Sequence, residues 1–177
     1  MTTASTDRVV PLILALDPAT STGYCVGRGG PRHAVLEAGA HVLGKASPGE
    51  KYAGLWALME MLRNRNAPIV AVAYEKGFHR GGAPTRFHLG CVAIVEMFAY
   101  RIGVPVYGAT VQQIKATSGG GGNADKASMI WRADHYFNRA CASDDEADAC
   151  WLYEWARGRL WSESQQRGNA WQVARSR

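Results

Sequence analysis

Four carboxylates stand where the chain can bring them together. Asp17 ends the apolar run of residues 9–16, and Glu75 ends the apolar run of residues 69–74. Asp145 and Asp148 lie three residues apart at the start of a helical pattern, so they share one helix face. Ionised carboxylates repel one another unless a divalent cation neutralises them, and oxygen ligands are those that Mg²⁺ and Mn²⁺ prefer. The sequence therefore predicts a metal-dependent enzyme.

The two apolar runs are typical of buried strands. Short runs rich in β-branched residues fit a sheet that is covered on both faces. A charge at the last residue of such a run emerges at the edge of the sheet, where α/β proteins keep their sites. Each acid taken singly also fits a structural role, as a turn residue or as a partner of a helix macrodipole. It is the conjunction of the four that favours a site.

Length and charge limit the class of protein. The chain has 177 residues, which fits one domain, and 20 Lys+Arg against 15 Asp+Glu give a net charge of +5. Because the predicted site is acidic, the basic excess must lie elsewhere. Residues 76–86 contain no acid, and residues 151–177 hold five arginines against two glutamates. An acidic pocket on a basic surface suits a polyanionic substrate that is cut with the help of metal ions.

The cysteines and the N-terminus favour a cytoplasmic protein. The four cysteines are Cys25, Cys91, Cys141 and Cys150. They show no C-x-x-C spacing and lie mostly in apolar segments, which is typical of small buried side chains in a reducing compartment. The first seven residues are polar and lack the apolar core of a signal sequence, and no stretch reaches membrane-spanning length. We therefore expect neither zinc ligands, nor disulfides, nor a membrane association.

The elements that must position the acids follow from periodicity and turn signals. Strands are expected at about residues 9–17, 24–27, 33–43, 69–75 and 104–107, the first three as a meander. Helices are expected at about residues 48–64, 85–101, 124–137 and 143–160, with a short helix after an N-cap at Thr110. The glycine-rich run at residues 118–123 reads as a hinge. This order describes an α/β protein with a ribonuclease H-like fold, a mixed five-stranded sheet flanked by helices.

Six short blocks carry a more specific signal: LALDPATSTGY at 14–24, YEKGF at 74–78, LGCVAIV at 89–95, VQQIK at 111–115, ADK at 124–126 and DEADA at 145–149. In order and spacing they resemble the RuvC family of Holliday junction resolvases, over residues 12 to about 152. Ala19 departs from the family, which usually has Gly after the Asp-Pro. The short length and divergent tail resemble a phage-encoded member. We therefore expect a nuclease domain at residues 1–160, and the polar, arginine-rich composition from Trp161 predicts a basic polar tail at residues 161–177.

The resemblance also implies a chemistry. Such an enzyme is a structure-selective DNA endonuclease that resolves four-way junctions by paired symmetric nicks. The four acids would hold two Mg²⁺ per active site, with Mn²⁺ able to substitute, one activating a water and the other stabilising the leaving 3′ oxygen. The products would carry 5′ phosphate and 3′ hydroxyl ends. Lys115 and Lys126 match two family lysines near the scissile phosphate, where a cation stabilises developing charge.

The basic segment after Glu75 is expected to bind DNA together with these two lysines. Its candidate contacts are Lys76, Phe78, Arg80 and Arg86. Phe78 lies in a basic, glycine-rich loop, where an exposed ring would stack on unpaired bases. A ring folded back on the core is the alternative.

Symmetry of the substrate implies a partner. A four-way junction is approximately two-fold symmetric and needs two cuts, so one site per chain implies a homodimer with an isologous interface. The helix expected at residues 85–101 has more apolar surface than one sheet needs, which makes it the candidate interface. Full burial of that helix inside the monomer is the alternative.

Other functions compete with this interpretation. Within the nuclease class, a broader debranching enzyme would act on Y-forks, flaps and replication intermediates. An actin-like ATPase shares the fold, and residues 17–23 could pass for its phosphate turn, but 177 residues cannot supply the two lobes that clamp ATP. We therefore expect no nucleotide cofactor. A non-catalytic junction-binding protein or packaging factor has little support, because all four acids are present.

Overall fold

The computed structural model describes residues 11–44, 47–66, 68–77, 81–119 and 125–166. Their five strands form one sheet in the order β3-β2-β1-β4-β5. β1 (Leu12–Asp17), β2 (Ser21–Arg28) and β3 (Val35–Val42) form an antiparallel meander. β4 (Ile69–Lys76) runs parallel to β1, and β5 (Val106–Thr110) runs parallel to β4. The predicted mixed five-stranded sheet is confirmed.

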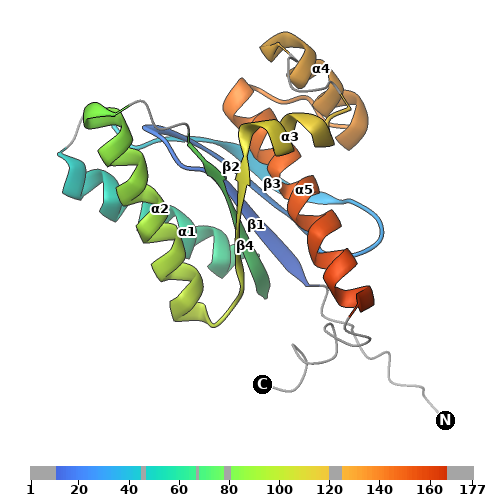
Figure 1. The fold of residues 1–177 in the computed structure, drawn as a ribbon, viewed down its shortest axis with the longest axis horizontal. Coiled ribbons are helices and arrows are strands. Elements are labelled where there is room, and N and C mark those ends of the chain that lie inside the picture. The colour runs from blue at the N-terminus through green and yellow to red at the C-terminus, as the bar shows by residue number, and fades with distance from the viewer. Residues whose placement is uncertain (1–10, 45–46, 67, 78–80, 120–124, 167–177) are drawn as a thin grey trace.

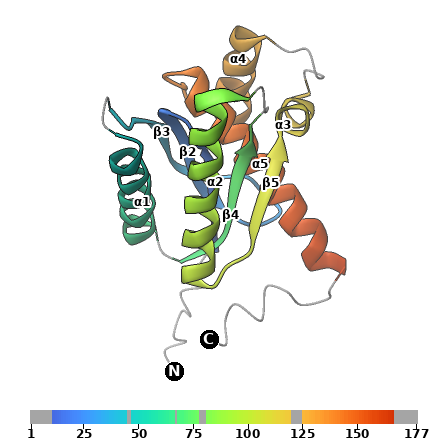
Figure 2. The same ribbon diagram turned by 60° about the vertical axis from the view of Figure 1, so that its left-hand side comes forward.

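Helices cover both faces of the sheet (Figure 1). α1 (Pro48–Arg65) and α2 (Gly82–Ile102) lie side by side on one face, as Figure 2 shows. α5 (Asp144–Gln166) crosses the other face, and α3 (Val111–Thr117) and α4 (Lys126–Phe137) pack against it. Within the described residues, no helix is both long enough and apolar enough to cross a membrane.

Alternation along β1 divides its side chains between two cores. Leu12, Leu14 and Leu16 pack toward α1 and α2, whereas Ile13 and Ala15 pack toward α5. All five are excluded from water, because the strand is central and both faces of the sheet are covered. By the same alternation, the next residue of β1 on the α5 face is Asp17, the last residue of the strand.

The α1–α2 layer is closely packed, and α1 begins with a side-chain cap. Ser47 and Glu50 form a capping box at the start of α1, each side chain accepting the backbone N–H of the other. The Tyr52 ring lies directly on the backbone of α2 at Gly90, where a Cβ would stand 2.2 Å from the Tyr52 Oη. Only a glycine allows this approach.

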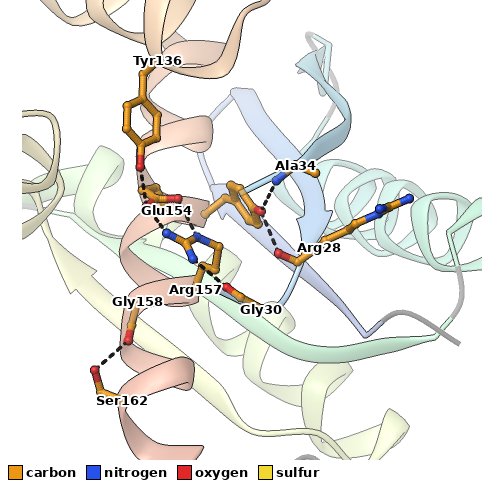
Figure 3. A network of polar contacts seen from close by, with 9 residues as sticks. Arg28, Gly30, Ala34, Tyr136, Glu154, Arg157, Gly158 and Ser162 are labelled. Carbon is orange, nitrogen blue, oxygen red and sulfur yellow. Dashed lines mark hydrogen bonds and ion pairs between the residues drawn. The ribbon is translucent and has the colours of Figure 1, made fainter. Parts of the chain in front are cut away.

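Tyr153 fastens α5 to the β2–β3 connection through Arg28 and Ala34, which are labelled in Figure 3. Its ring is fully buried, and its hydroxyl donates to the Arg28 carbonyl at 2.8 Å and accepts the Ala34 N–H at 3.1 Å. A Cβ at Gly27 would stand 2.5 Å from the ring, so the helix and strand approach closely here. One side chain thus satisfies two backbone groups of the connection.

One turn further along α5, a charged pair extends the same anchor (Figure 3). Arg157 donates to Glu154 at 2.5 Å and to the Gly30 carbonyl at 2.6 Å. Glu154 also accepts the Tyr136 hydroxyl of α4 at 2.8 Å. Because the pair is mostly buried and each partner has further hydrogen bonds, it couples α4, α5 and the β2–β3 connection.

Each predicted element is present in the described residues, but several ends differ. β2 begins three residues earlier than predicted, at Ser21, because it pairs with β3 from that point and with β1 from Gly23. β5 is shifted to Val106–Thr110 by its register with β4. α5 continues past residue 160 to Gln166, where Glu163 accepts the Tyr107 hydroxyl at 2.9 Å. Tertiary contacts therefore extend a helix whose polar composition suggested an end.

Further expectations concern the four cysteines, the hinge expected at residues 118–123 and the tail expected at residues 161–177. The four cysteines are free and three are buried, as predicted. Most of the expected hinge at 118–123, and residues 167–177 of the expected tail, lie outside the described residues. The division into a domain and a tail stays a prediction.

The hydroxyl of Tyr153 should contribute measurably to stability. Tyr153→Phe removes the donor to the Arg28 carbonyl and the acceptor for the Ala34 N–H, which should lower the free energy of unfolding by about 1–3 kcal/mol. Urea denaturation measures this loss. Ser162→Ala is the control, because it removes an exposed hydroxyl whose hydrogen bond, to the Gly158 carbonyl, lies within α5. Equal unfolding midpoints for the two variants would contradict the claim that the Tyr153 hydroxyl stabilises the packing of α5 on the β2–β3 connection.

Candidate active site

Asp17 and Glu75 lie side by side at the edge of the sheet. Each directly follows one member of the Leu16–Tyr74 pair, on adjacent parallel strands. Alternation places both on the face that α5 covers, since Ala15 of β1 and Ala73 of β4 belong to the α5 core. Both acids are half-buried. The strand-end positions predicted from the apolar runs therefore converge.

The first turn of α5 brings Asp145 and Asp148 to the same edge. Gly23, the cross-strand partner of Asp17, touches the α5 backbone, and a Cβ there would stand 2.0 Å from the Asp145 carbonyl oxygen. The Ser21 hydroxyl donates to the Asp145 carboxylate at 2.5 Å. Sequence reasoning singled out neither Ser21 nor Gly23. The signal that could have found them is the small-residue run that follows Asp17.

Glu146 lies between the two aspartates but has a different role. Its buried carboxylate accepts the Arg139 guanidinium at 2.7 Å and the Ala142 N–H at 2.9 Å. Arg139 also donates to the Ala38 carbonyl of β3 at 3.1 Å. This acid therefore anchors the start of α5 to the sheet and is not a member of the cluster.

Burial and mutual repulsion raise the pKa values of the clustered acids. The pKa of Asp17 is raised to about 7, mainly by burial and then by the charges of Asp148, Asp145 and Asp144. Burial and the charges of Asp17 and Asp148 raise the pKa of Glu75 to about 8. The pKa of Asp148 rises to about 6, again mainly through burial. A positive charge in this place would relieve the repulsion.

The two predicted lysines lie beside the acids in different ways. Lys115 of α3 is half-buried, and its charge acts to lower the pKa values of Glu75 and Asp148. Lys126 begins α4, has a side chain that is 83% exposed, and forms an ion pair with Asp144. The charges of both lysines therefore act on Asp148, and Lys126 is the more exposed of the two.

The predicted DNA contacts are described only in part. Lys76 ends β4 and is exposed, directly after Glu75. Arg86 is exposed in the first turns of α2. Phe78 and Arg80 lie outside the described residues, so their contacts stay predictions.

The donor set fits a hard divalent cation by its chemistry. It consists of carboxylate oxygens from three elements, half-buried and repelling one another, which is the ligand type that Mg²⁺ and Mn²⁺ prefer. As placed, no three His, Cys, Asp or Glu side chains of the described part of the chain are close enough to hold a metal ion.

The sheet order and its two helical layers define a ribonuclease H-like fold of the RuvC type. The structure of Thermus thermophilus RuvC matches with a TM-score of 0.71 and 22% identity, covering 84% of this chain and 96% of that chain. T. thermophilus RuvC in complex with Holliday junction substrate matches with a TM-score of 0.71 and 20% identity, covering 84% and 95%. No protein-family model matches the chain, and no curated protein does. At these identities the likeness establishes the fold.

Metal-free protein should lose stability as the pH rises from about 4 to about 8. The folded state keeps protons on Asp17, Glu75 and Asp148 that an unfolded chain, with ordinary carboxyl pKa values near 4, has already released. The free energy of unfolding falls wherever the folded state binds more protons.

The variant Asp148→Asn isolates this effect. It should raise the free energy of unfolding by about 1–2 kcal/mol at pH 8 and by about half as much at pH 5, because it removes one of the repelling charges. Denaturation in EDTA at both pH values measures the difference, with Asp125→Asn as control because asparagine keeps the exposed N-cap of α4. A change in the free energy of unfolding that is the same at both pH values would refute the electrostatic explanation.

Proposed function

We propose that this protein is a DNA endonuclease that resolves four-way junctions by paired symmetric nicks with two divalent metal ions. The observation that carries the proposal is the convergence of Asp17, Glu75, Asp145 and Asp148 at one sheet edge of a RuvC-type fold. The RuvC of the second matching structure is bound to a Holliday junction substrate, which supports branched DNA as the substrate class.

The four acids would hold two Mg²⁺, or Mn²⁺ in their place. When bound there, the metals would supply activation of a water for in-line attack and stabilisation of the leaving 3′ oxygen, so the products would carry 5′ phosphate and 3′ hydroxyl ends. Ser21 orients Asp145 through its short hydrogen bond. Lys115, whose charge acts on Glu75 and Asp148, would contact a non-bridging phosphate oxygen and stabilise charge that develops there.

The surface around the acids would hold the DNA backbone. Lys76 and Arg86 are exposed close in sequence to the site, and Lys126 would exchange its Asp144 partner for a phosphate. Arg80 would add a further phosphate contact from the same basic segment. Phe78 would stack on the poorly stacked bases at the branch point, where inserting a ring costs least.

A homodimer would supply the second cut. The outer face of α2 exposes an apolar stripe at spacings of four, four and three residues: Leu89, Ala93, Met97 and Tyr100. Residues at these spacings share one helix face. A contiguous exposed apolar face on a helix that is otherwise packed against the sheet suits an isologous interface.

Neutralising a metal ligand should remove cutting and spare binding. Asp17→Asn, Glu75→Gln and Asp148→Asn should each reduce Mg²⁺-dependent junction cleavage by at least about 10³-fold, while junction affinity in Ca²⁺ stays near that of the wild type. The panel of substrates should include four-way junctions, Y-forks, flaps and linear duplex, mapped at nucleotide resolution. Glu37→Gln, on β3, is the control.

Two results would overturn the proposal. Wild-type cutting in any of the three variants would remove the site assignment. A wild-type protein that cuts Y-forks and flaps as fast as four-way junctions would favour the broader debranching nuclease instead.

The α2 stripe predicts a specific assembly defect. Met97→Asp places a charge in the proposed interface and should yield a monomer by analytical ultracentrifugation, since buried charges without partners strongly oppose association. The monomer should nick junctions singly without the paired cut. Leu36→Asp, at a comparably exposed apolar residue of β3, should stay dimeric. A dimeric Met97→Asp variant would place the interface elsewhere.

A further inference from the structure

His88 of α2 bridges the two segments that follow Asp17 and Glu75. Its Nε2 lies 2.8 Å from the Gly77 backbone nitrogen, and its Nδ1 lies 3.0 Å from the Pro18 carbonyl oxygen. Pro18 directly follows Asp17, and Gly77 stands two residues after Glu75. One half-buried side chain therefore contacts both strand ends that carry the proposed metal ligands.

The polarity of the two contacts fixes the tautomer of the ring. A backbone N–H can only donate, so Nε2 accepts from Gly77, and the ring proton sits on Nδ1 and donates to Pro18. The approach is close, because a Cβ at Gly77 would stand 2.6 Å from Nε2. Since the ring is rigid, the two hydrogen bonds set the separation of the two segments.

The bridge lies where the sheet no longer joins these strands. The ladder between β1 and β4 ends at Leu16 and Tyr74, one residue before each acid. β1 stays paired with β2 through Asp17, and β4 stays paired with β5 through Lys76, so each strand end is held from its outer side. His88 links them across the inner side. It projects from a helix anchored in the core by Cys91, Val95 and Phe98.

We propose that His88 is a positioning residue, which holds the ends of β1 and β4 at the separation that Asp17 and Glu75 need to share a divalent cation. The inference rests on the proposed function for the identity of the ligands and deepens it. Partners that orient metal ligands from outside the coordination shell commonly contribute about 10- to 100-fold to metal affinity or activity.

A pair of substitutions separates the hydrogen bonds from the ring. His88→Phe keeps an aromatic ring and removes both hydrogen bonds, whereas His88→Gln keeps one acceptor and one donor without the ring. Mn²⁺ binding is measured by titration calorimetry on the full chain, alongside cleavage rates over a range of Mg²⁺ concentrations. We expect His88→Phe to weaken Mn²⁺ binding about tenfold or more and to slow cleavage at limiting Mg²⁺, with junction affinity in EDTA unchanged. His88→Gln should recover most of the loss.

Gly77→Ala tests the same contact from the other side, because its methyl group would meet Nε2, and it should also weaken Mn²⁺ binding. His135→Phe, on an exposed histidine of α4, is the matched control and should bind Mn²⁺ as the wild type does. Wild-type Mn²⁺ affinity in a folded His88→Phe variant would overturn the inference. Equal losses in His88→Phe and His88→Gln would do so too, because a side chain that keeps one donor and one acceptor would then restore nothing, and the two hydrogen bonds could not account for the effect.

The outcome is distinguishable from failure of the proposed function. If the wild-type chain binds Mn²⁺ but cuts no branched DNA, the function is wrong, and the calorimetric comparison of the His88 variants still decides whether His88 positions the ligands.

Discussion

Repulsion among half-buried carboxylates is the constraint around which this structure is built. Asp17, Glu75 and Asp148 would separate if the chain were free to let them, because burial and neighbouring charge both oppose their ionisation. Strand register and the start of α5 hold them together instead. The fold thus maintains an electrostatically unfavourable site, which is the pattern expected where stability is given up for function.

The opposing stabilisation comes from the two cores and from the anchors of α5. Ile13, Leu14 and Leu16 of β1 are fully buried, so the strand that ends in Asp17 has little freedom to shift. α5 is held at its start by Arg139 and Glu146, and further along by Tyr153 and the Glu154–Arg157 pair (Figure 3). These contacts lie at different levels of the helix, so displacing the aspartates requires breaking several of them together.

Much of this could be predicted from local sequence patterns. The apolar runs before Asp17 and Glu75 identify buried strands, and period-two alternation then decides which face each acid takes. The capping residue Thr110 and the three-residue spacing of Asp145 and Asp148 are likewise visible in the sequence. Such features depend on neighbours along the chain.

The parts that could not be predicted depend on contacts between distant residues. Ser21 meets Asp145 across 124 positions, and His88 meets Pro18 across 70. Gly23 is required because a helix from the far end of the chain touches it, which no local pattern reveals. The pairing of Lys126 with Asp144 is of the same kind, because it joins residues that are 18 positions apart.

A crystal structure of the protein grown with Mn²⁺, with anomalous diffraction recorded at the manganese edge, tests most directly whether the carboxylate cluster is a cation site. Anomalous peaks bounded by Asp17, Glu75 and Asp148, with their oxygens at coordination distance, are the predicted result. The absence of any peak at the cluster at saturating Mn²⁺, with manganese bound elsewhere on the surface, would contradict it.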